Sequence, residues 1–273
     1  MILLIVVLSL VVVFVGLRTV AFLRREKEDT DVFNPYLHKE KAGEVLHGEM
    51  IAFAENLPQN PQISCGVYAR IFKRFLDAFI SFFGLIILSP VFFALFVAII
   101  IDDPGPVFFK QTRVGKDMKF FKVHKFRSMK MSTPHDMPTH MLQNPEQYIT
   151  GVGKFLRKLS LDELPQIWDI FRGKMSIIGP RPALWNQADL VAEREKYGVN
   201  DLYPGLTGFA QINGRDELKI SEKVSYDRKY KENISFWFDV KCFFGTIVSV
   251  LKSDGVVEGG TGEIEKHKSK VGK

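Results

Sequence analysis

The feature that most constrains this chain is a long apolar run, Phe79 to Ile101, that contains no charged side chain. About 20 apolar residues in a helix are enough to cross the hydrocarbon core of a bilayer. Ser89 and Pro90 stand near the middle of the run, and proline lacks the backbone N–H and clashes with the preceding helical turn. A carbonyl freed in lipid needs another donor, and the Ser89 hydroxyl can supply one. The sequence therefore predicts a membrane helix that is broken at Ser89-Pro90.

Positive charge lies on both sides of this run. Lys73 and Arg74 precede it, and four further basic residues follow it: Lys110, Arg113, Lys116 and Lys119. Positively charged flanks tend to remain in the cytoplasm, so both ends of the run are expected on that side. A re-entrant helical hairpin over residues 75–101, which enters the bilayer and returns, fits the symmetric charge. A Pro-kinked helix that spans the membrane is the alternative.

The first residues form a second apolar segment, Met1 to Leu23, in which Arg18 is the only charged side chain. A signal peptide normally carries positive charge before its apolar region, whereas here Arg24 and Arg25 follow the apolar region. Residues 1–23 are therefore expected to be an uncleaved transmembrane anchor whose C-terminal side is cytoplasmic. A cleaved signal peptide is the alternative.

Two further stretches are polar. Residues 24–69 are broken by prolines, and we interpret them as a linker. Residues 256–273 are rich in Gly and Lys and are expected to form a mobile tail.

The overall charge narrows the class of partner. The chain has 37 Lys and Arg against 31 Asp and Glu, a formal net charge of +6. Such a balance suits nucleic acid, an anionic membrane surface or phosphorylated substrates, and the two apolar segments favour the latter two. Cys65 and Cys242 are the only cysteines, too few for a disulfide framework or a zinc site made of cysteines.

The segment after the long apolar run predicts a β-hairpin. Residues 107–111 and 120–126 are typical of strands, and the turn Val114-Gly115-Lys116-Asp117 joins them. Contact with anionic lipid headgroups explains several of the basic side chains in this segment. Lys125 and Arg127, at the end of the second strand, are the candidates for holding a phosphate group.

Asp162 and Glu163 form an adjacent acidic pair, for which two interpretations are open. Ser160 and Glu163 match the capping box of a helix N-terminus. An apolar stripe at helical spacing follows: Leu164, Ile167, Trp168 and Phe171. In this first interpretation Glu163 only caps the helix and Asp162 only offsets the helix dipole.

The second interpretation of the pair is a chemical site. Arg157 and Lys158 stand just before it, and a helix N-terminus binds anions. Two adjacent carboxylates can hold Mg²⁺, which usually keeps waters and binds substrate phosphates as well. Nearby positive charge keeps an aspartate ionised, as a nucleophile must be. Asp162 and Glu163 are therefore candidate catalytic and metal-binding residues.

Three later segments carry further signals. In Gly179-Pro180-Arg181-Pro182 the prolines hold Arg181 on a stiff backbone, where it can pair with phosphate or stack on a base. A rigid turn before a helix at residues 183–197 is the alternative. Residues 204–215 form a glycine-rich loop that allows a ligand to approach the backbone. Residues 236–251 predict either an interfacial amphipathic helix or an ordinary core helix.

From about Arg70 to Gly255 the chain resembles the bacterial sugar transferases known as monotopic polyprenyl-phosphate phosphoglycosyl transferases. The family's motifs occur in order: Lys73-Arg74 with Asp77, Ser89-Pro90, Lys125 to Met129, Ser160 to Leu164, Gly179 to Pro182, Pro204-Gly205 to Gly214-Arg215, and Asp239. The resemblance implies an α+β fold at residues 70–255. This fold is a mainly helical cytoplasmic domain with a small β-hairpin, a re-entrant membrane helix and interfacial amphipathic helices, to which the N-terminal anchor is added.

The resemblance also implies an enzyme of the bacterial cytoplasmic membrane, with its catalytic domain on the cytoplasmic face. It would transfer a phosphosugar from a UDP-sugar to undecaprenyl phosphate with Mg²⁺, as the first membrane step of polysaccharide or glycoconjugate synthesis. A covalent intermediate would form on Asp162 with release of UMP, and Glu163 would assist with the metal and with protons. The remaining implied site residues are Lys125, Arg127 and Arg157 for phosphate, Arg181 for the nucleotide, and Asp239 as a support of the site.

The chain departs from the family pattern at Tyr203 and Phe209, where Arg and Trp are usual. No sugar or nucleotide contact is therefore assigned at those positions. Two other functions stay open: a non-catalytic membrane adaptor, and a direct transferase in which Asp162 only binds Mg²⁺. A homo-oligomer is compatible with the sequence, and nucleic acid is not an expected partner.

Overall fold

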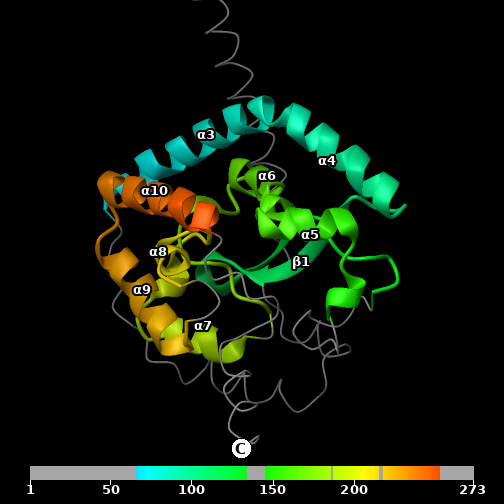
Figure 1. Ribbon diagram of the computed structural model, residues 1–273. Helices are drawn as coiled ribbons and strands as arrows, with labels where there is room; N and C mark the ends of the chain where they lie inside the picture. Colours follow the sequence, from blue (N-terminus) through cyan, green and yellow to red (C-terminus); the bar gives the residue numbers. More distant parts are fainter. Residues whose placement is uncertain (1–65, 134–144, 186, 215–217, 253–273) are drawn as a thin grey trace, which may run out of the picture.

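The structure is a computed structural model that describes four segments: residues 66–133, 145–185, 187–214 and 218–252 (Figure 1). The predicted anchor at residues 1–23, the predicted tail at 256–273 and most of the predicted linker at 24–69 lie outside the described residues. The described end of that linker is helical. A π-helical turn, Tyr68–Phe72, runs without a break into α3 (Lys73–Ile87).

The long apolar run forms two helices that meet at a sharp bend. α3 ends at Ile87, α4 (Ser89–Asp102) follows, and the two are bent by 60°. Pro90 has no N–H to donate to the carbonyl of Ile86 four residues earlier, and the Ser89 hydroxyl donates to that carbonyl instead, at 2.7 Å. The predicted break and the predicted role of Ser89 are confirmed. Among the described helices none is long and apolar enough by itself to span a bilayer, whereas this bent pair meets both criteria together.

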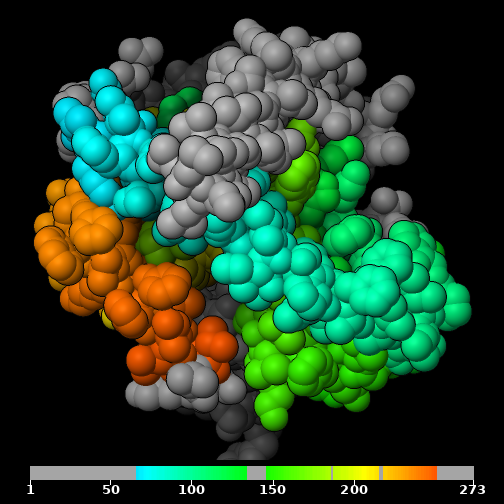
Figure 2. All heavy atoms as spheres, turned by 90° about the horizontal axis from the view of Figure 1, so that it is seen from above, coloured from blue at the N-terminus to red at the C-terminus, as the bar shows by residue number. Residues whose placement is uncertain are grey.

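The helix α3 turns its polar side chains inward and its apolar side chains outward. Lys73, Asp77 and Ser81 recur every four residues and are buried, while large apolar side chains such as Phe75 and Phe79 are exposed. Figure 1 shows α3 and α4 as a bent roof over the domain, and Figure 2 looks down on that roof, with α10 along one side. This inverted arrangement is expected for a helix that contacts lipid, because polar groups there must find partners within the protein.

The predicted β-hairpin is present beneath the roof. β1 (Phe108–Val114) pairs antiparallel with β2 (Phe120–Phe126) in one continuous register. Side chains on the two faces of β2 pack into two different hydrophobic clusters. Phe126 packs with residues of α4 and α5, and Val123 packs with Ile170 and Met175. The hairpin therefore joins the α4 side of the domain to the α6 side, with Lys125 near its end.

A second, parallel pair of strands was not predicted. β3 (Ser176–Ile178) lies beside β4 (Gly205–Thr207), with Ser176 opposite Gly205 and Ile178 opposite Thr207. Each strand has only three residues, which is too short for an alternating pattern to show in the sequence. The sheet brings Gly179-Pro180-Arg181 and Gly208 to one edge, because parallel strands end on the same side. The stretch 204–215, predicted as a loop, thus contains β4 and a short helix over Phe209–Ile212.

The other helices fill the domain below and beside the roof (Figure 1). They are α5 (Gly151–Lys158), α6 (Gln166–Phe171), α7 (Ala188–Glu195), α8 (Phe209–Ile212), α9 (Ile220–Glu232) and α10 (Phe236–Lys252). Short 3₁₀ turns lie at Lys116–Met118, Pro145–Tyr148, Leu161–Glu163 and Val199–Asp201. The helix expected at residues 183–197 is shorter than predicted: α7 covers Ala188–Glu195, and residues 183–185 are not helical. The predicted C-terminal helix is present as α10, with Trp237 and Phe244 strongly exposed.

Candidate active site

The acidic pair lies in a tight turn between two helices. α5 ends at Lys158, Ser160 takes a left-handed conformation with φ of 54°, and a 3₁₀ turn over Leu161–Glu163 follows. Pro165 then separates this turn from α6. The Ser160 side chain makes no capping bond to the turn. The interpretation of Glu163 as a mere helix cap is therefore wrong, because its carboxylate bonds to side chains of other elements.

Glu163 is held by two cations from distant parts of the sequence. Lys125 Nζ, on β2, lies 2.8 Å from Oε1, and Arg181 donates to Oε1 at 2.7 Å and to Oε2 at 3.2 Å. The Glu163 side chain is 10% exposed. Burial alone would favour the neutral acid, but Arg181 and Lys125 outweigh it and hold the pKa of Glu163 well below its usual range. Glu163 is therefore a firmly ionised carboxylate.

Asp162 is the opposite case. Burial raises the pKa of Asp162, and the charge on Glu163 adds to that rise, although Lys125, Arg157 and Arg181 act against it. Lys125 Nζ is 4.0 Å from Oδ2, and the Asp162 side chain is 15% exposed. The cations thus act in the predicted direction, and burial acts against them. Asp162 is an incompletely neutralised carboxylate that solvent can still reach.

The cations expected around the pair separate into two groups. Lys125 and Arg181 bind Glu163, and Arg157 at the end of α5 lowers the pKa of Asp162 while its Nε donates to Ser128 Oγ at 2.9 Å. Arg127 instead contacts Asp103, donating to its carboxylate at 3.1 Å and also to its main-chain carbonyl. The structure therefore brings Lys125, Arg157 and Arg181 to the acidic pair and uses Arg127 to fasten the end of α4.

The position of Arg181 depends on two residues that the sequence did not indicate. Arg194, on α7, donates to the Arg181 carbonyl at 2.9 Å. Its guanidinium also bonds to Asp227 on α9, at 2.6 and 2.9 Å, and both side chains are buried. Only the fold reveals this link, because Arg194 and Asp227 are ordinary charged residues of two helices in the sequence.

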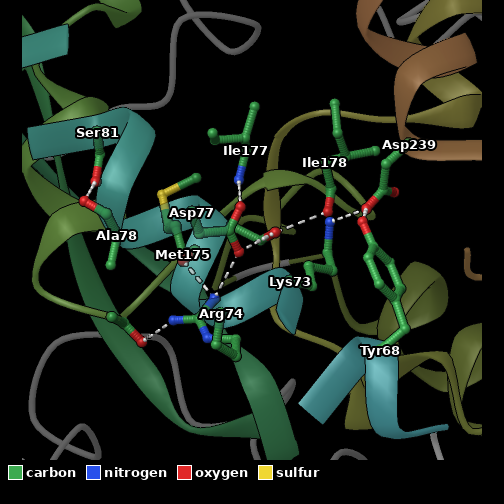
Figure 3. A network of polar contacts seen from close by, with 12 residues as sticks. Tyr68, Lys73, Arg74, Asp77, Ala78, Ser81, Met175, Ile177, Ile178 and Asp239 are labelled. Carbon is green, nitrogen blue, oxygen red and sulfur yellow. Dashed lines mark hydrogen bonds and ion pairs between the residues drawn. The ribbon is translucent and has the colours of Figure 1, made fainter. Parts of the chain in front are cut away.

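Asp239 belongs to a second cluster of buried charges, which we call the anchor cluster: Tyr68, Lys73, Arg74, Asp77, Ser176, Tyr230 and Asp239 (Figure 3). Lys73 Nζ lies 2.7 Å from Asp239 Oδ2, and Tyr230 donates to Oδ1 at 2.7 Å. Asp77 accepts from Ser176 Oγ at 2.8 Å and from the Ile177 amide at 3.0 Å. Within the described residues, these contacts tie α3 to α10 and β3, and none joins Asp239 to Asp162 or Glu163.

The acidic pair supplies two carboxylates, fewer groups than a metal site made of protein side chains alone requires. Across the described segments, no group of three or more His, Cys, Asp or Glu residues is placed to hold a metal ion. Both oxygens of Glu163 already accept from cations, whereas the charge of Asp162 is less neutralised. Such a pair fits Mg²⁺, which is commonly held by one or two carboxylates together with the phosphates of a substrate.

These features define a class: an α+β domain with an outward-facing apolar helix pair and a buried acidic dyad among cations. Within that class the chain belongs to the bacterial sugar transferase family, whose model matches residues 68–253.

Similar proteins from several bacteria support the same family assignment. The UDP-glucose:undecaprenyl-phosphate glucose-1-phosphate transferase of Escherichia coli K12 is 41% identical over 191 residues, 65% of this chain and 40% of the relative. The exopolysaccharide production protein ExoY of Sinorhizobium fredii NGR234 is 36% identical, over 68% of this chain and 88% of the relative. The uncharacterized sugar transferase EpsL of Bacillus subtilis 168 is 36% identical, over 68% and 90%. The matched region thus spans less than half of the E. coli protein but nearly all of ExoY and EpsL.

Proposed function

We propose that this protein transfers a sugar-1-phosphate from a UDP-sugar to undecaprenyl phosphate on the cytoplasmic face of the bacterial inner membrane. The observation that carries the proposal is the difference between two neighbouring carboxylates. Glu163 is fully paired and its pKa is lowered, while Asp162 is buried, poorly paired and its pKa is raised. Adjacent acids whose pKa values are pushed apart are characteristic of sites where they take different chemical roles.

Asp162 is the proposed nucleophile. One of its carboxylate oxygens attacks the β-phosphorus of the UDP-sugar and forms a P–O bond, while the bond from that phosphorus to the bridging oxygen breaks and UMP leaves with the electron pair. An oxygen of undecaprenyl phosphate then attacks the same phosphorus and releases Asp162. The products are undecaprenyl diphosphosugar and UMP, and no water is consumed. A poorly solvated carboxylate that remains accessible suits this role.

The cations are proposed to neutralise and orient the diphosphate, and Glu163 is proposed to hold two of them in place. Lys125, Arg157 and Arg181 act on the acidic pair from three separate elements, and phosphoryl transfer depends chiefly on such positioning and charge neutralisation. Glu163 keeps Lys125 and Arg181 in place through its ion pairs. Asp162 and Glu163 would hold Mg²⁺, which would supply positive charge to neutralise the diphosphate further.

The helix pair is proposed to dip into the bilayer and return. The polar side chains of α3 face the domain, large apolar side chains of both helices are exposed, and both ends of the pair attach to the same body. This arrangement would hold the acidic pair near the level of lipid phosphates, where undecaprenyl phosphate presents its headgroup. The exposed aromatic side chains of α10, on the same side of the domain, support contact with the interface.

The decisive experiment is to trap the intermediate. The purified full chain in lipid nanodiscs is incubated with Mg²⁺ and a UDP-sugar labelled in the sugar, without undecaprenyl phosphate. A labelled adduct on the peptide that contains Asp162, lost in Asp162→Asn, is expected. Turnover with acceptor but no adduct without it would favour the direct transferase. No UMP release with any UDP-sugar of a panel that includes glucose, galactose and their N-acetyl derivatives would favour the adaptor.

A further inference from the structure

One buried side chain has neither of its polar atoms satisfied. Gln211, on α8, is 5% exposed, and within the described residues neither its amide oxygen nor its amide nitrogen has a hydrogen-bond partner. Buried side-chain amides nearly always have hydrogen-bond partners, because an amide without one loses its hydrogen bonds to water on burial and gains none in return. The other unsatisfied buried atom in the described residues, Arg127 Nε, belongs to a guanidinium that bonds through its remaining nitrogens. Gln211 therefore calls for an explanation in terms of a ligand.

The amide lies at the edge where the parallel strands end. A Cβ atom on Gly208, just after β4, would come within 2.0 Å of the Gly179 carbonyl oxygen and 2.7 Å of Gln211 Oε1. Gly208 thus packs directly against the Gly179 carbonyl and lies beside the Gln211 amide, and a side chain at Gly208 would meet both. In parallel sheets, ligands bind outside the carboxyl ends of the strands.

This edge is close in the chain to the acidic pair's main cation. Arg181 follows Gly179 by two residues, and its guanidinium bonds to Glu163 at 2.7 Å. Gly179 itself is fixed, because its N–H donates to the Thr207 carbonyl at 2.8 Å. The Gln211 amide therefore lies near the backbone from which Arg181 extends to the acidic pair.

We infer that Gln211 reads the imide edge of the uracil ring. A primary amide offers an N–H donor beside a carbonyl acceptor, and uracil presents the complementary pair, an N3–H donor beside a carbonyl oxygen. Because the Gln211 amide has no hydrogen bonds to other described residues, it can turn toward this edge without breaking any of those. The inference rests on the proposed use of a UDP-sugar, and it makes Gln211 a specificity-determining residue that acts on binding rather than on the chemical step.

The test compares UMP with its N3-methyl analogue, which lacks the N3–H donor. Binding of each to the full chain in nanodiscs is measured by calorimetry for the unaltered protein, for Gln211→Met and for the control Gln187→Met. Gln187 is a suitable control because its amide oxygen is already used, accepting from the Leu184 amide at 2.9 Å. The unaltered protein and the control should bind UMP at least about tenfold more tightly than the analogue, since a donor lost from a buried pair is costly. Gln211→Met should bind the two equally, within about twofold.

A second measurement excludes a purely structural role. Replacing an unpaired buried amide by an apolar side chain of similar size should leave the Tm of Gln211→Met unchanged or higher. A Tm lowered by several degrees, or discrimination that survives in Gln211→Met, would overturn the inference while UMP binding to the unaltered protein still supports the proposed function. Failure of the unaltered protein to bind UMP would overturn both.

Discussion

The acidic pair and the anchor cluster contain the same kinds of side chain in opposite states. In the anchor cluster every carboxylate oxygen has partners: Asp77 accepts from three donors and Asp239 from three. In the active site Glu163 is similarly complete, but Asp162 has a cation only at 4.0 Å and a raised pKa. A completed network fixes the position of a helix. A network that leaves one carboxylate without a close partner lowers the stability of the fold, but that carboxylate remains available for chemistry.

The largest effect should come from Asp162→Asn. The nucleophilic oxygen is lost, so UMP release from a UDP-sugar with undecaprenyl phosphate should fall by at least about 10³-fold. Stability should not fall with it. Because burial raises the pKa of Asp162 in the folded state, its ionised form destabilises the fold at neutral pH, and a neutral amide removes that cost. The measurements are UMP release and Tm, and a variant that loses activity only because its Tm drops would contradict the comparison.

The next largest effect should be on stability, in Asp239→Asn. Lys73 would keep its charge in a buried site without a counter-charge at 2.7 Å, which typically costs about 3 kcal/mol. Denaturant unfolding in detergent measures this loss. Glu193→Gln is the matched control, since its ion pair with Lys196 is solvent-accessible and is expected to contribute little to stability. A kcat loss without a change in unfolding free energy would instead move Asp239 into the active site.

Glu163→Gln should change both properties moderately. Lys125 and Arg181 lose their main acceptor, so the unfolding free energy at neutral pH should fall by about 1–3 kcal/mol, with a smaller activity loss than for Asp162→Asn. The lowered pKa of Glu163 means that its contribution is present above the pKa of the unfolded chain. It is lost as the pH falls through the folded pKa.

The opposite pKa shifts of Glu163 and Asp162 predict how the stability of each variant changes with pH. The difference in unfolding free energy between the unaltered protein and Glu163→Gln should shrink as the pH is lowered into the acid range. For Asp162→Asn the difference has the opposite sign: the variant should be more stable than the unaltered protein at neutral pH. This extra stability should disappear as the pH is lowered into the acid range. Parallel pH profiles for the two variants would contradict the opposite pKa shifts.

The smallest effect should come from Ser89→Ala. The Ile86 carbonyl loses the hydroxyl at the helix break, and one hydrogen bond of this kind contributes about 1 kcal/mol. We expect a slightly lower Tm in nanodiscs and nearly unchanged UMP release. Loss of activity at an unchanged Tm would indicate that the break itself aligns the acidic pair with the lipid acceptor.

Several features followed from the sequence because they depend on neighbouring residues. Pro90 breaks the helix between α3 and α4, and two strand-like segments joined by a turn form the β1–β2 hairpin. Asp162 and Glu163 are neighbours because they are consecutive in the chain. The resemblance to a family with the same motifs then indicated a chemistry for that adjacency. These inferences are local, and local patterns survive folding.

The tertiary structure decided what distant residues do to one another. Lys73 and Asp239 pair across 166 positions, Arg127 turns to Asp103 instead of the acidic pair, and β3 and β4 are too short to be recognised except by their pairing. The opposite pKa shifts of Asp162 and Glu163 are the clearest case. The two acids are neighbours in the chain, yet burial dominates one and two ion pairs dominate the other, and both terms exist only once the chain has packed.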